Sequence, residues 1–273
     1  MQLTGIFVYP VKSLGGFGVT TRAVDSLGLA DDRRFMVVDA DGRAVTQRNV
    51  PRMALVSTEI NSTTLELSAP GAGSIEVSRS SVSPSATARR VSVWRSEGLV
   101  ADDCGDEPAS WLGNFLQVSC RLVQIGRQFD RPVLDPRALP TDRVSFADAH
   151  PFLVISEASL ADLNARLVNQ DKAALPMNRF RPNLVVSGCA AFAEDGWTRF
   201  KIGELIFRSA GPCSRCVITT TDQATAEVGK EPLRTLATYR RDAAEPTNVN
   251  FGMNLIHETK SGTLRVGDNV ELL

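Results

Sequence analysis

The sequence predicts a β-rich α+β fold, and three observations support that class. Short runs rich in β-branched residues recur along the 273-residue chain, and clusters of Gly, Pro, Asp and Ser separate them. Their spacing of roughly ten residues is typical of a barrel or sandwich rather than of alternating βαβ units. Helical periodicity is confined to a few short segments. We therefore expect a β-barrel with a few peripheral helices, together with a second β-rich module.

The predicted strands form two groups along the chain. The first group comprises residues 3–11, 35–39, 44–47, 54–60, 64–68, 74–78 and 90–94. The second group comprises residues 121–125, 152–155, 183–186, 199–202, 205–208, 217–221 and 264–272. Residues 69–89 are rich in Gly, Ser and Pro, and we expect them to hold an exposed loop. We place a boundary near residues 118–122, which gives an N-terminal β-rich module (1–120) and a second module (121–273).

Three segments carry helix signals. Residues 107–116 place their large apolar side chains on one stripe, and Pro108 suits the first turn. Ser156 can cap a second helix, whose leucines at 160, 163 and 167 share a face. Pro232 opens a third, short helix.

Composition excludes several classes of protein. The formal net charge is −1 and basic residues are interspersed with acidic ones, so the chain lacks the basic block that nucleic-acid binding needs. No run approaches the roughly 20 apolar residues of a membrane span, so we expect no membrane association. The five cysteines are an odd number and no secretory leader precedes them. These features predict reduced thiols and a cytoplasmic location.

The motif GPCSRC at residues 211–216 is the most informative feature of the chain. Cys213 and Cys216 lie between two strand-like runs, where a turn can present sulfur to a pocket. A zinc half-site, a thioredoxin-like redox pair and two small buried cysteines are the alternatives. A zinc site lacks a second cysteine pair, and a redox pair would need a following helix. Arg215 favours a functional pair, because a guanidinium lowers a thiol pKa and binds oxyanions.

Further polar residues recur at strand ends. The loop VKSLGG at residues 11–16 combines a cation, a hydroxyl and two glycines, which together can bind a phosphate. Two arginines precede the strand that begins at Phe35, and one of them is Arg34. Pro182 restricts its neighbours, so Arg181 and Asn183 can be held toward a common ligand.

These segments in combination identify a family. In chain order they are YPVKS (9–13), DRRF (32–35), RFRPN (179–183), GPCSRC (211–216), KEPL (230–233) and VGDNVELL (266–273). The series resembles the MOSC-domain proteins that carry an added N-terminal β-barrel module. Within them, it resembles the mitochondrial amidoxime reducing component and its bacterial relatives. The resemblance covers essentially the whole chain, and it implies a MOSC-type β-barrel with an N-terminal β-rich module.

The resemblance implies a molybdenum cofactor, a phosphorylated pterin whose dithiolene binds the metal. By the family's pattern Cys216 is the protein ligand of molybdenum, which suits the preference of this metal for soft thiolates. Positions that match cofactor-binding residues of the family are Lys12, Ser13, Arg34, Arg181, Asn183, Ser214 and Arg215. Asp148 and Asn254 match positions that line the same pocket. Ala149 stands beside Asp148, where a hydroxyl could otherwise donate to the cofactor.

The function implied is the removal of oxygen from N-hydroxylated substrates such as amidoximes, hydroxylamines or N-hydroxylated bases. The cofactor carries the two-electron chemistry, and Asp148 is a candidate catalytic acid, because no histidine stands out for that role. No cysteine follows Cys216, so we expect electrons from a separate iron–sulfur, flavin or haem protein. Residues 126–148 are the expected substrate lid.

Two other functions are compatible with these motifs. One is a molybdenum-cofactor carrier or sulfur-transfer module in which Cys216 bears a persulfide. The absence of an aminotransferase-like domain argues against that function, and no pyridoxal phosphate is expected. The other is a binding protein without turnover.

Overall fold

The structure is a computed structural model that describes residues 1–79 and 87–273. Its first lobe contains β5 (Phe35–Val38), β6 (Ser57–Ile60), β7 (Thr64–Ala69), β8 (Gly73–Ser78), β9 (Ala88–Val93), β10 (Ser96–Asp103) and β11 (Arg121–Gln124). Its second lobe contains β1 (Gln2–Val8), β2 (Phe17–Val19), β3 (Thr21–Asp25), β4 (Gly28–Leu29), β12 (Phe152–Ser156), β13 (Leu184–Ser187), β14 (Arg199–Ile202), β15 (Leu205–Ser214), β16 (Asn250–His257), β17 (Gly262–Arg265) and β18 (Val270–Leu272). The α-helices are α1 (Asp106–Leu116), α2 (Glu157–Val168) and α3 (Leu233–Leu236). The 3-10 helices are η1 (Pro51–Leu55), η2 (Met177–Arg179), η3 (Ala193–Gly196) and η4 (Val217–Thr220).

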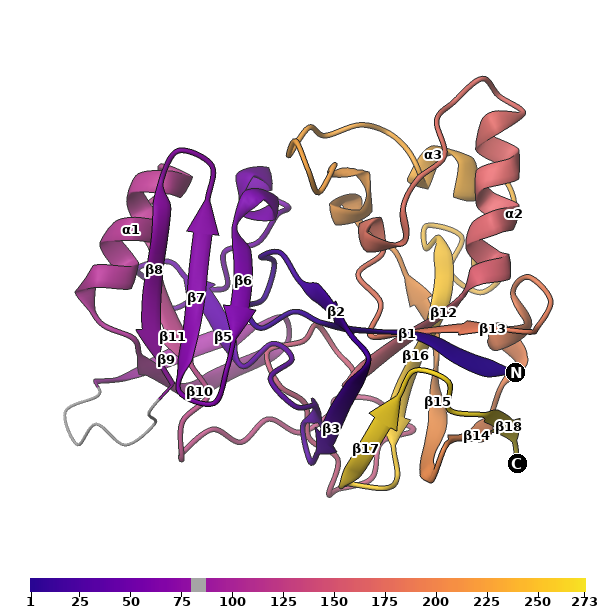
Figure 1. The fold of residues 1–273 in the computed structure, drawn as a ribbon, viewed down its shortest axis with the longest axis horizontal. Helices are drawn as coiled ribbons and strands as arrows, with labels where there is room; N and C mark the ends of the chain where they lie inside the picture. Colours follow the sequence, from indigo (N-terminus) through magenta and orange to yellow (C-terminus); the bar gives the residue numbers. More distant parts are fainter. Residues whose placement is uncertain (80–86) are drawn as a thin grey trace.

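These elements confirm the predicted β-rich class with few helices. Figure 1 shows the two lobes side by side, with α1 on the outer side of the first lobe and α2 on the outer side of the second. The second lobe is built on an eight-stranded sheet in the order β18-β14-β15-β16-β12-β13-β1-β2. The first lobe contains the sheets β5-β11-β10-β9 and β6-β7-β8. No helix of residues 1–79 and 87–273 has both the length and the apolar character needed to cross a bilayer.

The boundary that we predicted near residue 120 does not separate the strands of the two lobes. Strand β1, from the very start of the chain, pairs with β13 and β2 in the large sheet of the second lobe. Conversely, β11 pairs with β5 and β10 in the first lobe, although it follows residue 120. The division into modules 1–120 and 121–273 therefore stays a prediction about sequence units, and the chain crosses between the lobes more than once.

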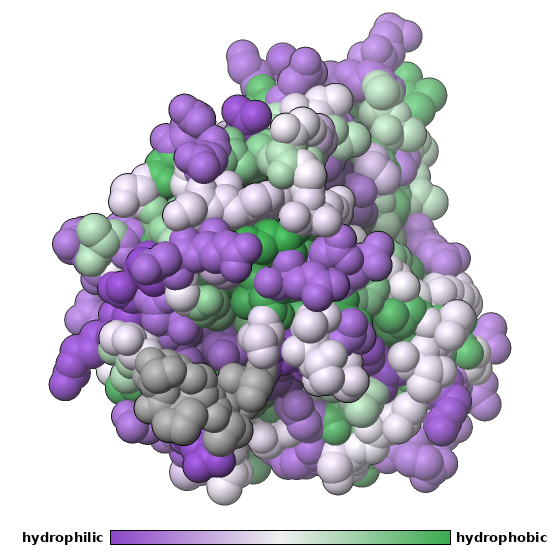
Figure 2. All heavy atoms as spheres, turned by 60° about the vertical axis from the view of Figure 1, so that its left-hand side comes forward, coloured by the Kyte–Doolittle hydropathy of each residue, from purple (hydrophilic) through white to green (hydrophobic). Residues whose placement is uncertain are grey.

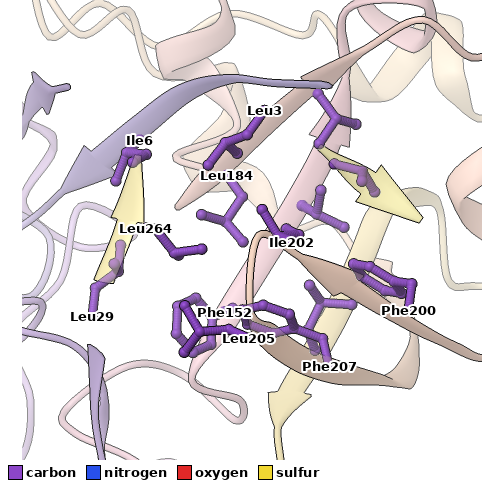
Figure 3. Packing of buried hydrophobic residues seen from close by; sticks show 14 of the residues in the cluster. Leu3, Ile6, Leu29, Phe152, Leu184, Phe200, Ile202, Leu205, Phe207 and Leu264 are labelled. Carbon is purple, nitrogen blue, oxygen red and sulfur yellow. The ribbon is translucent and has the colours of Figure 1, made fainter. Parts of the chain in front are cut away.

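Burial explains the strand patterns of the two lobes. In β7 and β8 every second side chain is buried, because one face of their sheet packs on a core and the other faces solvent. Strands β12 and β13 are buried along almost their whole length, because α2 covers one face and a second core lies on the other. Figure 3 shows that second core, where Phe152 meets Phe207 edge-on with ring centroids 5.3 Å apart.

The predicted helices are present. Ser156 caps α2 as expected, because its hydroxyl accepts the backbone N–H of Ser159 at 3.0 Å. Pro108 lies in the first turn of α1. The third helix, α3, begins directly after Pro232 and is a single turn.

Several strand predictions were wrong. Residues 44–47 form only an isolated bridge at Ala44, and residues 264–272 divide into β17 and β18. The central strand β16 was missed, because Gly252 and two asparagines interrupt its apolar pattern. Residues 217–221 are not a strand, since η4 occupies residues 217–220 and Thr221 forms only an isolated bridge with Val228. In the predicted loop 69–89, β8 occupies residues 73–78, and residues 80–86 lie outside the described residues.

The surface in Figure 2 is mainly hydrophilic, and its hydrophobic areas are small and interrupted by polar side chains.

Candidate functional site

Two adjoining hollows lie where segments of the two lobes meet. The inner cavity has a volume of about 130 Å³, and its polar and sulfur-bearing lining residues include Lys12, Ser13, Arg33, Asp148, Arg181, Asn183, Cys213, Arg215 and Cys216. The outer cleft has a volume of about 530 Å³, and its lining includes Arg48, Trp94, Arg95, Asp148, Cys213, Ser214, Cys216, Glu245 and Asn254. Cys216, Asp148 and Asn254 line both hollows. The sequence-predicted cysteine pair therefore lies at the junction of a small polar cavity and an open cleft.

The backbone places the two cysteines at the end of β15. The pairing of β15 with β16 shifts on both sides of Pro212, so the strand departs from regular register as it reaches Cys213. Cys216 then forms the N-cap of η4. Because the chain turns between the two residues, Cys213 and Cys216 line the same cavity from adjacent positions.

The two thiols have different surroundings. Burial raises the pKa of Cys213, and this effect outweighs the opposing influence of the Arg215 guanidinium. Arg215 donates through Nη1 to the Sγ of Cys213 at 2.9 Å and through Nη2 to the carbonyl of Phe180 at 2.6 Å. Both cysteines lie on the surface that the cavity and the cleft share, and Cys213 is the one engaged as a hydrogen-bond acceptor of Arg215.

Lys12 and Asp148 form an ion pair at the wall of the inner cavity. The Lys12 ammonium is buried and also donates to the carbonyl of Phe146 at 3.0 Å. Burial lowers the pKa of Lys12, and Asp148 offsets part of that effect. Burial alone would raise the pKa of Asp148, but the Lys12 ammonium and the hydrogen bonds to the carboxylate outweigh it, so this pKa lies below its usual range. Asp148 is therefore ionised at neutral pH.

Two guanidinium groups stack on one buried tyrosine. The Cζ atoms of Arg33 and Arg181 each lie 4.3 Å from the centroid of the Tyr9 ring. Burial raises the pKa of Tyr9 to about 12, so its hydroxyl stays protonated. Arg33 also donates to both carboxylate oxygens of Asp32, at 2.8 and 2.7 Å. The stack fixes the positions of two cations at the wall of the inner cavity.

Three residues that line the inner cavity have left-handed backbone conformations. The φ angles are 66° at Ser13, 49° at Arg33 and 53° at Arg181. Non-glycine residues rarely adopt this region, and such strain concentrates at functional sites. The strain supports a binding role for this cavity.

Arg34 does not line either hollow. Its guanidinium donates to Asp25 at 2.7 Å and to the carbonyl of Leu29 at 3.1 Å. The left-handed turn at Arg33 directs Arg33, rather than Arg34, into the cavity. Arg33 therefore lines the inner cavity, and the role of Arg34 in cofactor binding stays a prediction.

The remaining predicted residues lie at the site with different partners. Asn183 is buried, and its Oδ1 accepts the backbone N–H of Leu153 at 3.2 Å. Asn254 donates to the carbonyl of Pro212 at 3.3 Å and lines both hollows. Ser214 lines the outer cleft only. The predicted lid segment contributes Arg131, Pro132 and Leu134 to the wall of the outer cleft.

Sequence reasoning missed three residues of the site. His150 lines both hollows, and its Nε2 lies 3.1 Å from a carboxylate oxygen of Asp135. Trp94 and Arg48 reach the outer cleft from the first lobe, and the Arg48 guanidinium lies 4.4 Å from the centroid of the indole ring. These three residues lie outside the sequence motifs that identified the family. They reach the cleft because the fold brings distant segments together.

The donor set fits an anionic group. Within the described residues, the buried Nη2 of Arg181, Nε of Arg215 and Nε of Arg48 have no hydrogen-bond partner. Buried N–H groups without partners are costly, so a ligand that accepts them is favoured. These donors, with Lys12 and Arg33 nearby, are suited to the phosphate and oxygen atoms of a phosphopterin.

The described residues contain no cluster of three or more His, Cys, Asp or Glu side chains that could hold a metal ion. A metal at Cys216 would obtain its other ligands from a bound group, as a molybdenum held by a dithiolene does. The residues present therefore fit the implied cofactor.

Comparisons with known proteins identify the family of this chain. Residues 1–119 match the family model of the MOSC N-terminal beta barrel domain, and residues 141–271 match that of the MOSC domain. Mitochondrial amidoxime-reducing component 1 is 37% identical over 98% of this chain and 81% of its own length in Mus musculus. In Homo sapiens it is also 37% identical, over 98% of this chain and 82% of its own length. Mitochondrial amidoxime reducing component 2 of Rattus norvegicus is 38% identical over 97% of this chain and 81% of its own length. The chain therefore belongs to the family of MOSC-domain proteins that also carry the MOSC N-terminal β-barrel domain.

Proposed function

We propose that this chain is a molybdenum-cofactor-dependent reductase that removes oxygen from N-hydroxylated substrates. These include amidoximes, hydroxylamines and N-hydroxylated bases. The observation that carries the proposal is the position of Cys216, a thiol that lines both a cation-lined cavity and an open cleft. Cys213 lines both hollows as well, but its Sγ accepts a hydrogen bond from Arg215. Relatives named for amidoxime reduction match almost the full chain, which supports the same activity here.

The inner cavity is the proposed cofactor site. Cys216 would bind molybdenum, and the bound cofactor would supply the two-electron oxygen-transfer chemistry. The proposed pterin and phosphate contacts are Lys12, Ser13, Arg33, Arg181, Asn183 and Arg215. Ser214 and Asn254 would contact the cofactor from the rim. Arg34 would act indirectly, because its bonds to Asp25 and Leu29 hold the turn that precedes β5.

Asp148 would orient groups rather than donate protons. Its ion pair with Lys12 and its lowered pKa favour the ionised carboxylate, which is a hydrogen-bond acceptor. Half of its side chain remains exposed to the cleft, so it can accept an N–H group of a substrate while it holds Lys12. This role replaces the catalytic acid suggested by the sequence.

Electrons would come from a separate iron–sulfur, flavin or haem protein. The outer cleft gives such a partner and the substrate a common approach to Cys216. The proposed location is the cytoplasm, where a reducing environment keeps thiols free, and all five cysteines of this chain are unpaired.

The decisive experiment measures the molybdenum content of protein made in a host that synthesises the cofactor. Wild-type protein and the Cys213→Ser variant should each hold close to one molybdenum per chain, whereas Cys216→Ser should hold little. Loaded wild-type protein with a chemical reductant should convert an aromatic amidoxime to the amidine. Metal-free wild-type protein that releases sulfur to cyanide would instead establish the sulfur-transfer function.

A further inference from the structure

Trp94 occupies an unusual position for a large aromatic residue. It is the first residue of the two-residue turn that joins β9 to β10, where Ser96 pairs with Val93. Its φ angle is 53°, a conformation that such turns normally assign to Gly, Asn or Asp. The side chain is 58% exposed, the only aromatic among the strongly exposed large hydrophobic residues of the described chain. A strained and exposed tryptophan has no evident value for folding, so its position points to function.

The surroundings of Trp94 fix the orientation of its ring. The Arg48 guanidinium stacks on the indole at 4.4 Å from the centroid, and Arg48 also lies 4.0 Å from Asp148. The Trp94 side chain also lies close enough to Asp148 to lower the pKa of that carboxyl group. Cation and carboxylate therefore hold the indole in place, while more than half of its surface stays uncovered. A ring fixed in this way can bind a flat ligand with little loss of conformational entropy.

The uncovered surface of Trp94 belongs to the outer cleft. Pro132, Leu134 and Pro212 add apolar surface to the same cleft, and Leu134 is also 58% exposed. Cys216 lies on the part of the wall that continues into the inner cavity. A substrate whose N–O group reaches toward Cys216 would therefore leave the rest of its structure in the cleft beside Trp94. Aromatic faces bind flat conjugated groups by offset stacking.

We propose that Trp94, held by Arg48 and Asp148, is a specificity-determining platform that selects substrates in which the N-hydroxylated group is conjugated with a planar ring. The preferred class is aromatic amidoximes and N-hydroxylated heteroaromatic amines, over aliphatic hydroxylamines. This inference rests on the proposed function and deepens it. The acceptor at Asp148 adds to the preference, because conjugated amidoximes and N-hydroxylated heterocycles carry N–H groups in the ring plane.

Kinetics with two substrates test the platform. Trp94→Ala should lower kcat/KM for an aromatic amidoxime roughly tenfold, as the loss of one stacking contact predicts, and change it less than about twofold for an N-alkylhydroxylamine. Trp94→Phe should retain most of the preference, because it keeps an aromatic face. Val168→Ala, which shortens a side chain of similar exposure on α2 outside both hollows, is the matched control. Equal losses for both substrates in Trp94→Ala would overturn the platform.

Fluorescence provides a readout that is independent of turnover. Of the three tryptophans, Trp197 is 4% exposed and Trp111 is half-buried in the first lobe, so flat ligands in the cleft should quench mainly Trp94. Benzamidine and adenine should quench cofactor-free wild-type protein with saturation, n-butylamine should not, and Trp94→Phe should lose the effect. Saturable quenching without turnover would overturn the proposed reductase function and leave the platform standing. Turnover without quenching, or quenching that persists in Trp94→Phe, would overturn the platform.

Discussion

The Arg215 guanidinium connects the two motifs of the candidate site, because it donates to the Sγ of Cys213 at 2.9 Å and to the carbonyl of Phe180 at 2.6 Å. Phe180 precedes Arg181, so the cysteine motif positions the arginine motif directly. Cys213 therefore contributes by holding Arg215, which explains how two neighbouring thiols can have separate roles.

Substitutions of Cys213 should separate these roles. Cys213→Ser keeps an acceptor for Arg215 and should change the free energy of unfolding little. Cys213→Val leaves a partly buried N–H donor without its partner and should destabilise the protein by about 1 kcal/mol. Urea unfolding of the cofactor-free variants measures both effects. The assignment fails if Cys213→Ser abolishes molybdenum binding as completely as Cys216→Ser does.

Gly16 supports the stack of Tyr9 with the two arginines. A Cβ at this position would lie 2.2 Å from Cδ1 of Tyr9 and 2.7 Å from the carbonyl oxygen of Val8. Gly16→Ala should therefore displace the ring on which Arg33 and Arg181 stack, and lower cofactor retention at least severalfold after gel filtration. Gly196→Ala is the matched control, because its Cβ would meet nothing within 4 Å. Equal cofactor retention in both variants would show that the stack does not support the cofactor site.

The Lys12–Asp148 pair predicts coupling between two substitutions. Asp148→Asn leaves the buried Lys12 ammonium without its anion and should destabilise the cofactor-free protein by about 1–2 kcal/mol. The effect is smaller than for a fully buried pair because the Asp148 side chain is half exposed. In Lys12→Met protein, the same Asp148→Asn change should cost less than about 0.5 kcal/mol. A double-mutant cycle from urea unfolding measures the coupling, and simple additivity would contradict it.

His257 predicts how stability depends on pH. Burial lowers the pKa of His257 from 6.5 to about 4, and its Nε2 lies 2.8 Å from the carbonyl oxygen of Asp25. Between these pKa values the unfolded chain binds the additional proton, so stability rises with pH through this window and falls as pH drops from 6.5 toward 4. The change amounts to roughly 3 kcal/mol at most.

The variant His257→Gln should flatten this slope, measured as the free energy of unfolding between about pH 5 and pH 6.5. His150 is the other histidine of the chain, and burial lowers its pKa as well. A variant that lacks both imidazoles should therefore lose nearly all of the slope in this range. An unchanged slope in His257→Gln would assign the pH dependence to other groups.

The sequence motifs predicted several residues that gather at the inner cavity. They did not predict the orientation of every side chain. Lys12, Arg181 and Cys216 lie around one cavity, as their motifs suggested. Arg33 and Arg34 are adjacent, and only the positive φ of Arg33 determines which of them faces the cavity. Composition and periodicity carry no signal for such a turn.

The segment after Cys216 shows why propensity failed locally. Residues 217–221 are rich in β-branched side chains, which favour strands in general. In η4, however, the Thr219 hydroxyl donates to the carbonyl of Cys216 at 2.9 Å, and the Thr220 hydroxyl donates to that of Val217 at 2.8 Å. These local bonds satisfy carbonyl groups without a neighbouring strand. His150 and Trp94 were missed because their roles depend on contacts with distant segments.

The pairing of β1 with β13, which matches Gln2 with Ser187, also constrains the order of events during translation. Strand β1 can pair early with β2, but it must wait until β13 has been made before it pairs on its other side, and such long-range closure is slow. A fragment that starts at residue 121 would lack an interior strand of its own sheet. Shortened versions of this protein should therefore keep the first eight residues, although they lie far in sequence from Cys216.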